Sequence, residues 1–165
     1  MKLLLVILAL AWAGLLVCIP ARAQTTTERA ISAVCPYRGA KAFAPFIDAA
    51  SRRYMLHPVT IVAVMRVESV CFPDVHSKAW ATGLMQILPW GPARNKLSWA
   101  ELFDPETNIH TGARWLAMMS TWCGSLHRGL GAYATGKCDR GHRYARKVMA
   151  VVARIRRSIE GGSSK

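Results

Sequence analysis

The sequence lacks several features that mark other kinds of protein. No segment alternates apolar and polar residues as a half-buried strand does, which excludes a β-sheet protein. No internal repeat, low-complexity block or linker occurs, and 165 residues allow one domain. None of the five cysteines forms a Cys-x-x-Cys pair, and no two histidines have metal-binding spacing on a helix face. We therefore expect one all-α domain with no metal and no cofactor.

Acidic residues are also scarce, with nine Asp and Glu against 22 Lys and Arg and a formal net charge of +13. A charge of this size on a small domain favours an anionic partner, such as nucleic acid, anionic lipid or an anionic cell-wall polymer. Export of the protein, which residues 1–23 predict, disfavours nucleic acid. Contact with a membrane surface is an option for the basic C-terminal helix, and we expect a monomer.

Residues 1–23 have the pattern of a secretory signal peptide. Lys2 gives a positive start, residues 3–17 are almost all apolar, and Ala21-Arg22-Ala23 fits a small-x-small cleavage signal. The apolar run is shorter than the roughly 20 residues needed to span a bilayer. We expect cleavage after Ala23 and a periplasmic or secreted protein, whose net charge would be 13 − 2 = +11.

Four cysteines follow this segment, and an even number in an exported chain favours two disulfides. Three pairings are possible. We favour Cys123–Cys138, because the two residues are close in sequence and bracket a glycine-rich stretch. Cys35–Cys71 then follows by elimination.

The remaining sequence is predicted to form an all-α domain of six or seven helices over residues 41–160. Residues 24–40 look irregular, and 161–165 form a polar tail expected to be disordered. Apolar periodicity, capping residues and prolines predict helices over 41–54, 58–69, a short stretch near 98–101, 104–122 and 140–159.

Glu68 is the acidic residue with the most unusual predicted setting. It lies near the C-terminal end of an apolar helix, where a negative charge opposes the helix dipole. Neighbours such as Met65 and Val67 offer little solvation, so its pKa should rise toward neutrality. A carboxyl of that kind can first donate a proton and then take one back. Periodicity alone would favour a solvated surface glutamate. The sequence after Glu68 distinguishes a surface role from a catalytic one.

Three downstream motifs resemble the lytic transglycosylases of the soluble-lysozyme-like (SLT) family. The first is Glu68-Ser69, followed by Ser77 and by Gly-Leu-Met-Gln-Ile-Leu-Pro at 83–89. The second and third are similar to the segments at 104–116 and 132–148, so the resemblance runs from about residue 43 to 150. It implies a lysozyme-like fold with a substrate groove.

The resemblance implies that Glu68 is the single catalytic acid/base. It would cleave the β-1,4 bond between N-acetylmuramic acid and N-acetylglucosamine in peptidoglycan and leave a 1,6-anhydro end. Small exported members of this kind often open the wall for secretion or conjugation machines, which makes such a machine an expected partner.

Further roles follow from the same resemblance. Ser77 and Gln86 would hydrogen-bond substrate, and Met85 would line the groove. Tyr133 would sit across from Glu68 and either orient it or steady the developing charge. Trp80 stands where the family commonly has glycine and could add a stacking wall for sugar. The structural positions of the motifs are Ser69, Gly83, Asn108 and Gly112, with Asn108 bracing the catalytic helix through backbone hydrogen bonds.

The sequence alone permits other functions as well. A lysozyme-type muramidase would add water and would want a second carboxylate, for which Asp74 is the nearest in sequence. A non-catalytic peptidoglycan-binding component of a secretion machine is another class. Ala134 replaces the asparagine that usually follows the motif tyrosine, which removes a polar group near the site.

Overall fold

The computed structural model describes residues 24–89 and 97–161. The predicted signal peptide, the segment 90–96 and the predicted tail after Gly161 lie outside these ranges. Within them the chain is all-α, as predicted, with no strand and seven α-helices. The elements are α1 (Thr26–Val34), a 3-10 turn η1 (Arg38–Phe43), α2 (Ala44–Tyr54), α3 (Pro58–Glu68), α4 (Trp99–Phe103), α5 (Pro105–Trp122), α6 (Leu126–Thr135) and α7 (His142–Gly161).

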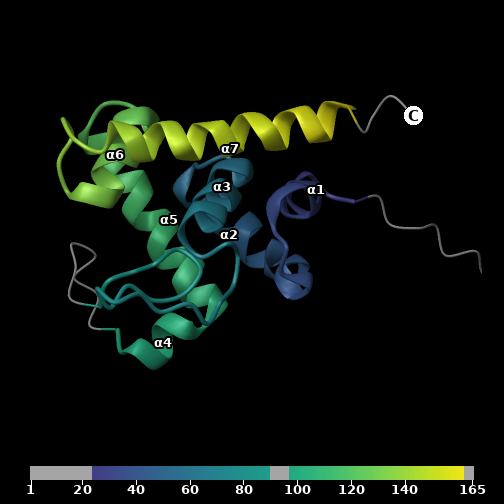
Figure 1. Ribbon diagram of the computed structural model, residues 1–165, viewed down its shortest axis with the longest axis horizontal. Helices are drawn as coiled ribbons and strands as arrows, with labels where there is room; N and C mark the ends of the chain where they lie inside the picture. Colours follow the sequence, from purple (N-terminus) through teal and green to yellow (C-terminus); the bar gives the residue numbers. More distant parts are fainter. Residues whose placement is uncertain (1–23, 90–96, 162–165) are drawn as a thin grey trace, which may run out of the picture.

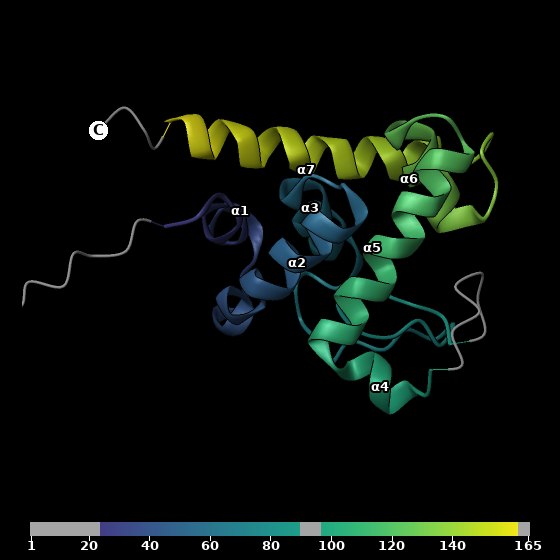
Figure 2. The same cartoon turned by 180° about the vertical axis from the view of Figure 1, so that it is seen from behind.

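Helix α3 occupies the centre of the domain. It packs against α1, α2 and α7, and α7 lies across it along one side of the molecule (Figures 1 and 2). On the other side, α5 packs against α2, α4 and α6. None of the helices in the described ranges is long and apolar enough to cross a bilayer, and this includes the long α7.

The sequence of α3 explains its position. His57 caps the helix by accepting a hydrogen bond from the Val59 N–H, and Pro58 fits the first turn. Every residue from Val59 to Met65 is buried. A helix that is apolar all round belongs in a core, and its C-terminal end brings Glu68 to the edge of that core.

Two helices arise where the sequence predicted none. Residues 24–40 are not irregular, because α1 begins at a capping box formed by Thr25 and Glu28 and buries Ala30 and Ile31. The threonine run looks unstructured in sequence, yet its first member supplies the cap. The sequence did not predict helix α6, because its glycines lower helix propensity, although Ser125 caps its start.

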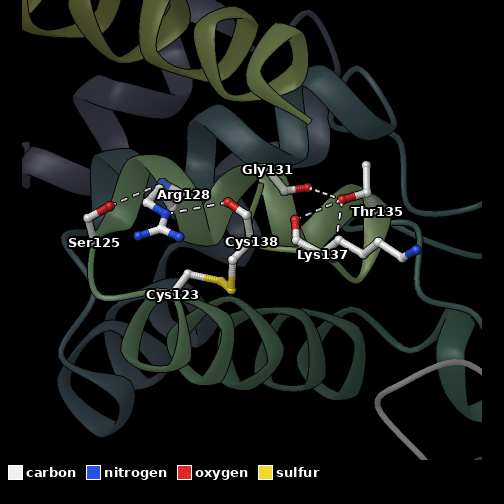
Figure 3. The surroundings of a disulfide bond; sticks show 7 residues. All are labelled: Cys123, Ser125, Arg128, Gly131, Thr135, Lys137 and Cys138. Carbon is white, nitrogen blue, oxygen red and sulfur yellow. Dashed lines mark hydrogen bonds between the residues drawn. A yellow bond between two sulfur atoms is a disulfide. The ribbon is translucent and has the colours of Figure 1, made fainter. Parts of the chain in front are cut away.

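Both predicted disulfides are present. Cys35–Cys71 joins the end of α1 to the residues just after α3, with Cα atoms 5.5 Å apart. Cys123–Cys138 joins the end of α5 to the loop between α6 and α7 (Figure 3). The Cys138 carbonyl also accepts a hydrogen bond from Arg128 of α6 at 3.4 Å. The second disulfide therefore fixes the chain shortly before α7 begins.

A loop over residues 75–89 follows α3 and is held by backbone pairing. Thr82 and Ile87 exchange two N–H···O hydrogen bonds of 3.0 Å. The Gln86 side-chain amide donates to the carbonyls of Val75 and Gly83, each at 3.0 Å. These bonds give the loop a defined shape without a regular strand.

Asn108 of α5 holds this loop in place through side-chain hydrogen bonds. Its fully buried side chain donates to the carbonyls of Thr82 (2.8 Å) and Leu102 (2.7 Å) and accepts from the Met85 N–H (2.7 Å). One amide therefore satisfies three buried backbone groups on two segments. It braces the loop, whereas the sequence had suggested a brace for the catalytic helix.

Gly83 and Gly112 permit this close approach. A Cβ at Gly83 would lie 2.3 Å from the Asn108 amide nitrogen, and the residue has a left-handed φ of 77°. A Cβ at Gly112 would lie 2.5 Å from the Met85 sulfur. Both motif glycines are thus needed for packing between the loop and α5.

Replacing Asn108 with alanine should destabilise the protein by roughly 3–5 kcal/mol, because three buried backbone groups lose their partner. Denaturant-induced unfolding measures this loss. Arg114→Ala, an exposed change on the same helix, should stay within about 0.5 kcal/mol of the unmutated protein. A loss below about 1 kcal/mol for Asn108→Ala would show that the brace is unimportant.

Candidate active site

Glu68 is the last residue of α3 and is partly buried. The Tyr144 hydroxyl, on α7, donates a hydrogen bond to its Oε1 atom. The Tyr133 ring of α6 lies nearly parallel to the Tyr144 ring, with centroids 6.2 Å apart. The end of α3 and the consecutive helices α6 and α7, which lie far along the chain from it, therefore meet at one carboxyl group.

Burial raises the pKa of Glu68 above its ordinary value of 4.5. The Tyr144 hydrogen bond and the positive charge of Lys147 oppose this rise, but desolvation is the largest effect. Burial and the Glu68 charge also raise the pKa values of Tyr133 and Tyr144, so both phenols stay protonated.

This arrangement can perform acid/base chemistry. The raised pKa increases the fraction of Glu68 that can donate a proton near neutral pH. After donation, the Tyr144 O–H stabilises and orients the carboxylate. No other carboxylate in the described ranges contributes to the pKa shift of Glu68.

The residue after Glu68 connects α3 to the loop. The Ser69 hydroxyl is buried and donates to the Leu84 carbonyl at 2.8 Å, with the Met65 carbonyl 3.2 Å away. The end of α3 and the loop therefore cannot move independently of each other.

Tyr133 lies near Glu68, but it does not hydrogen-bond to it. Its hydroxyl donates to the Met85 carbonyl at 2.6 Å. The charge of Glu68 acts on Tyr133 electrostatically and raises its pKa. The tyrosine that orients the carboxyl is Tyr144, one helix further along the chain. The predicted orienting role of Tyr133 is therefore wrong.

Met85 also differs from its prediction. Its side chain is completely buried and packs against Gly112. It therefore belongs to the core and does not line a groove. The motif methionine acts through its backbone, which binds both Asn108 and Tyr133.

The other predicted contact residues lie on the loop. The Ser77 hydroxyl accepts from the Ala81 N–H at 3.0 Å and so shapes the turn. Trp80 is 46% exposed and stacks on Trp99, with ring centroids 4.8 Å apart. No hydrogen bond in the described ranges connects Ser77 or Gln86 to Glu68. The roles of Ser77, Trp80 and Gln86 toward substrate stay predictions.

Sequence reasoning missed Tyr144 and Lys147 as functional residues. Tyr144 lay within the third motif segment, 132–148, but the sequence assigned it no role of its own. Its spacing of one turn before the buried Val148 placed it on the core-facing side. A hydroxyl on that side needs a partner, which was the available signal.

No group of three or more His, Cys, Asp or Glu residues in the described ranges could hold a metal ion. The side chains that meet at Glu68 supply carboxyl and phenol groups.

Replacing Glu68 with glutamine should stabilise the protein in a pH-dependent way. Because the folded-state pKa is raised, the unfolded state ionises first as the pH increases, and the unmutated protein loses stability from about pH 4.5 up to its folded pKa. Glutamine does not titrate, so the advantage of Glu68→Gln should appear in that window and then level off. Denaturant unfolding between pH 4 and 8 measures it, and an advantage that shrinks as the pH rises would contradict a raised pKa.

Comparison with known proteins identifies the family of this chain. The family described as "Transglycosylase SLT domain" matches residues 45–149, well over half of the chain. Membrane-bound lytic murein transglycosylase C of Sodalis glossinidius is 39% identical over 79 residues, covering 42% of this chain and 22% of that protein. The Pectobacterium atrosepticum protein of the same name is 34% identical over 86 residues, covering 47% and 24%.

A third relative is Endo-type membrane-bound lytic murein transglycosylase A of Klebsiella pneumoniae, 32% identical over 93 residues, covering 51% of this chain and 46% of that protein. The chain therefore spans less than half the length of each of these relatives. The matched segment contains Glu68, the loop that follows α3, Asn108, Tyr133 and Tyr144. This chain belongs to the SLT transglycosylase domain family.

Proposed function

We propose that this protein is a lytic transglycosylase that cleaves the glycan strands of peptidoglycan. The observation that supports this most is Glu68, a lone desolvated carboxyl whose raised pKa suits proton donation and whose orientation is set by Tyr144. Family membership over residues 45–149 supports the same substrate class.

The proposed reaction uses Glu68 twice. Its protonated carboxyl donates to the glycosidic oxygen between N-acetylmuramic acid and N-acetylglucosamine, and the bond from that oxygen to the anomeric carbon breaks. The resulting carboxylate takes the proton from the 6-hydroxyl of the muramyl sugar. That oxygen bonds to the anomeric carbon, closing a 1,6-anhydro ring and restoring the protonated acid.

The muramyl acetamido group is proposed to stabilise the positive charge at the anomeric carbon between these steps. One carboxyl then suffices, where ordinary glycosidases use a pair. Asp74, the alternative second acid, is exposed. Water must be excluded from the anomeric carbon, since hydrolysis would otherwise compete.

The loop that follows α3 is the proposed substrate-binding element. Ser69 ties it to the end of α3 and Asn108 ties it to α5, so its residues keep a fixed position relative to the helix of Glu68. Ser77, Gln86 and the exposed Trp80 are proposed to contact the sugars. Tyr133 is proposed to act close to the reacting centre, with its hydroxyl held by the Met85 carbonyl.

We further propose that the protein works in the periplasm or after secretion and acts as a monomer. The signal-peptide pattern of residues 1–23 supports export. Local opening of the wall for a secretion or conjugation apparatus is the proposed biological context. It rests on the resemblance to small exported members of the family.

Digestion of purified peptidoglycan, with mass spectrometry of the released muropeptides, tests the function. We expect products with 1,6-anhydro ends. Glu68→Gln should lower the rate at least ~10²-fold, because general acid/base catalysis is lost. Glu101→Gln, a change at an exposed glutamate, should keep the rate.

Two other outcomes would contradict the proposal. Reducing ends in place of anhydro ends would indicate a lysozyme-type hydrolase. Binding of peptidoglycan without any release would indicate a non-catalytic component of a secretion machine.

A further inference from the structure

A cavity of about 230 Å³ lies where α1, α3 and α7 meet, beside the helix end that holds Glu68. Its apolar wall consists of four valines, Val34, Val67, Val70 and Val151. Figures 1 and 2 show α7 lying across α1 and α3 at this junction. The volume is below the roughly 300 Å³ at which pockets for drug-sized ligands begin, so it suits one or two small residues of a longer ligand.

Three cations complete the lining of this cavity: Arg66 of α3 and Lys147 and Arg154 of α7. Within the described ranges, none of the three forms a salt bridge with a carboxylate. Three positive groups beside an apolar wall fit a ligand that has carboxylates together with short aliphatic groups.

The backbone at Val70 supports a functional interpretation of the cavity. Val70 has a φ of 56° and is 38% exposed. A left-handed conformation is costly for a β-branched residue, and such strain concentrates at functional sites. Here it places an apolar side chain in the cavity two residues after Glu68.

The cavity and the catalytic carboxyl share α7. Tyr144 binds Glu68, Lys147 lowers its pKa, and Val151 and Arg154 continue along the cavity. From Tyr144 to Arg154 the helix rises about 15 Å. Five residues of extended peptide span roughly 17 Å. A peptide attached to a sugar at Glu68 is thus long enough to reach Arg154.

We propose that this cavity binds the acidic stem peptide attached to the muramyl sugar of the cleaved strand. The inference rests on the proposed function. A stem peptide has free carboxylates for the three cations and alanyl methyl groups for the valines. It also begins on the sugar whose bond is broken, which agrees with a cavity next to Glu68.

The cavity depends on parts of the chain outside the family match. Val34, Val151 and Arg154 lie beyond residues 45–149. Helix α1 and the second half of α7 thus give this chain a peptide site in addition to the shared catalytic site. Selection for strands that have intact stems is the expected result.

The test compares initial rates on glycan strands with stem peptides and on strands stripped by an amidase. We expect the unmutated protein to favour peptide-bearing strands, and Arg154→Gln to lower this rate ratio roughly 10-fold. Arg156→Gln removes an exposed α7 charge that does not line the cavity, so it should keep the ratio. Equal rates on both strands for the unmutated protein would overturn the inference while leaving the transglycosylase function intact.

A binding experiment tests the cavity without turnover. A synthetic alanyl-glutamyl-diaminopimelyl tripeptide should shift the NMR methyl signals of Val34, Val67 and Val151, and the same peptide with amidated carboxylates should shift them far less. If both peptides leave these signals unchanged, the inference fails. It also fails if phosphatidylglycerol vesicles, and not the peptide, bind in a manner that requires Arg154.

Discussion

The structure depends on one constraint: a carboxyl group held out of water at the end of a buried helix, with a phenol O–H as its partner. Burial of Glu68 favours its protonated form, and the Tyr144 hydroxyl favours its charged form. The first effect is larger, yet the second keeps the ionised state accessible. A carboxyl balanced in this way can exchange a proton in both directions during one reaction.

The rest of the fold keeps these two side chains together. Glu68 ends α3, and the chain is fixed immediately afterwards by Ser69 and by the Cys35–Cys71 disulfide. Tyr144 lies in the first turn of α7, which begins four residues after Cys138 of the other disulfide. The covalent links therefore flank the two elements that meet at the site, which limits their relative motion.

Much of this could be predicted from the sequence because local chemistry specifies it. Pro58, the apolar run after it and the Ser98–Glu101 capping box specify helices by themselves. The position of Glu68 at the end of α3 follows from the same pattern. Local sequence could not show which tyrosine reaches the carboxyl, since Tyr133 and Tyr144 both face the core and only helix packing separates their roles. Met85 was misassigned for a similar reason: its burial depends on the missing side chain of Gly112, which lies on another helix.

Direct titration of the Glu68 carboxyl tests the central claim. Carbon-13 NMR of protein labelled at glutamate side chains, with the Glu68 signal assigned by its loss in Glu68→Gln, follows this group alone. The account predicts a midpoint above 4.5 that rises further in Tyr144→Phe, because the hydrogen bond that lowers the pKa is removed. Glu101 serves as an internal reference and should titrate below 4.5 in both proteins. A Glu68 midpoint at or below 4.5, or one unmoved by Tyr144→Phe, would contradict the account.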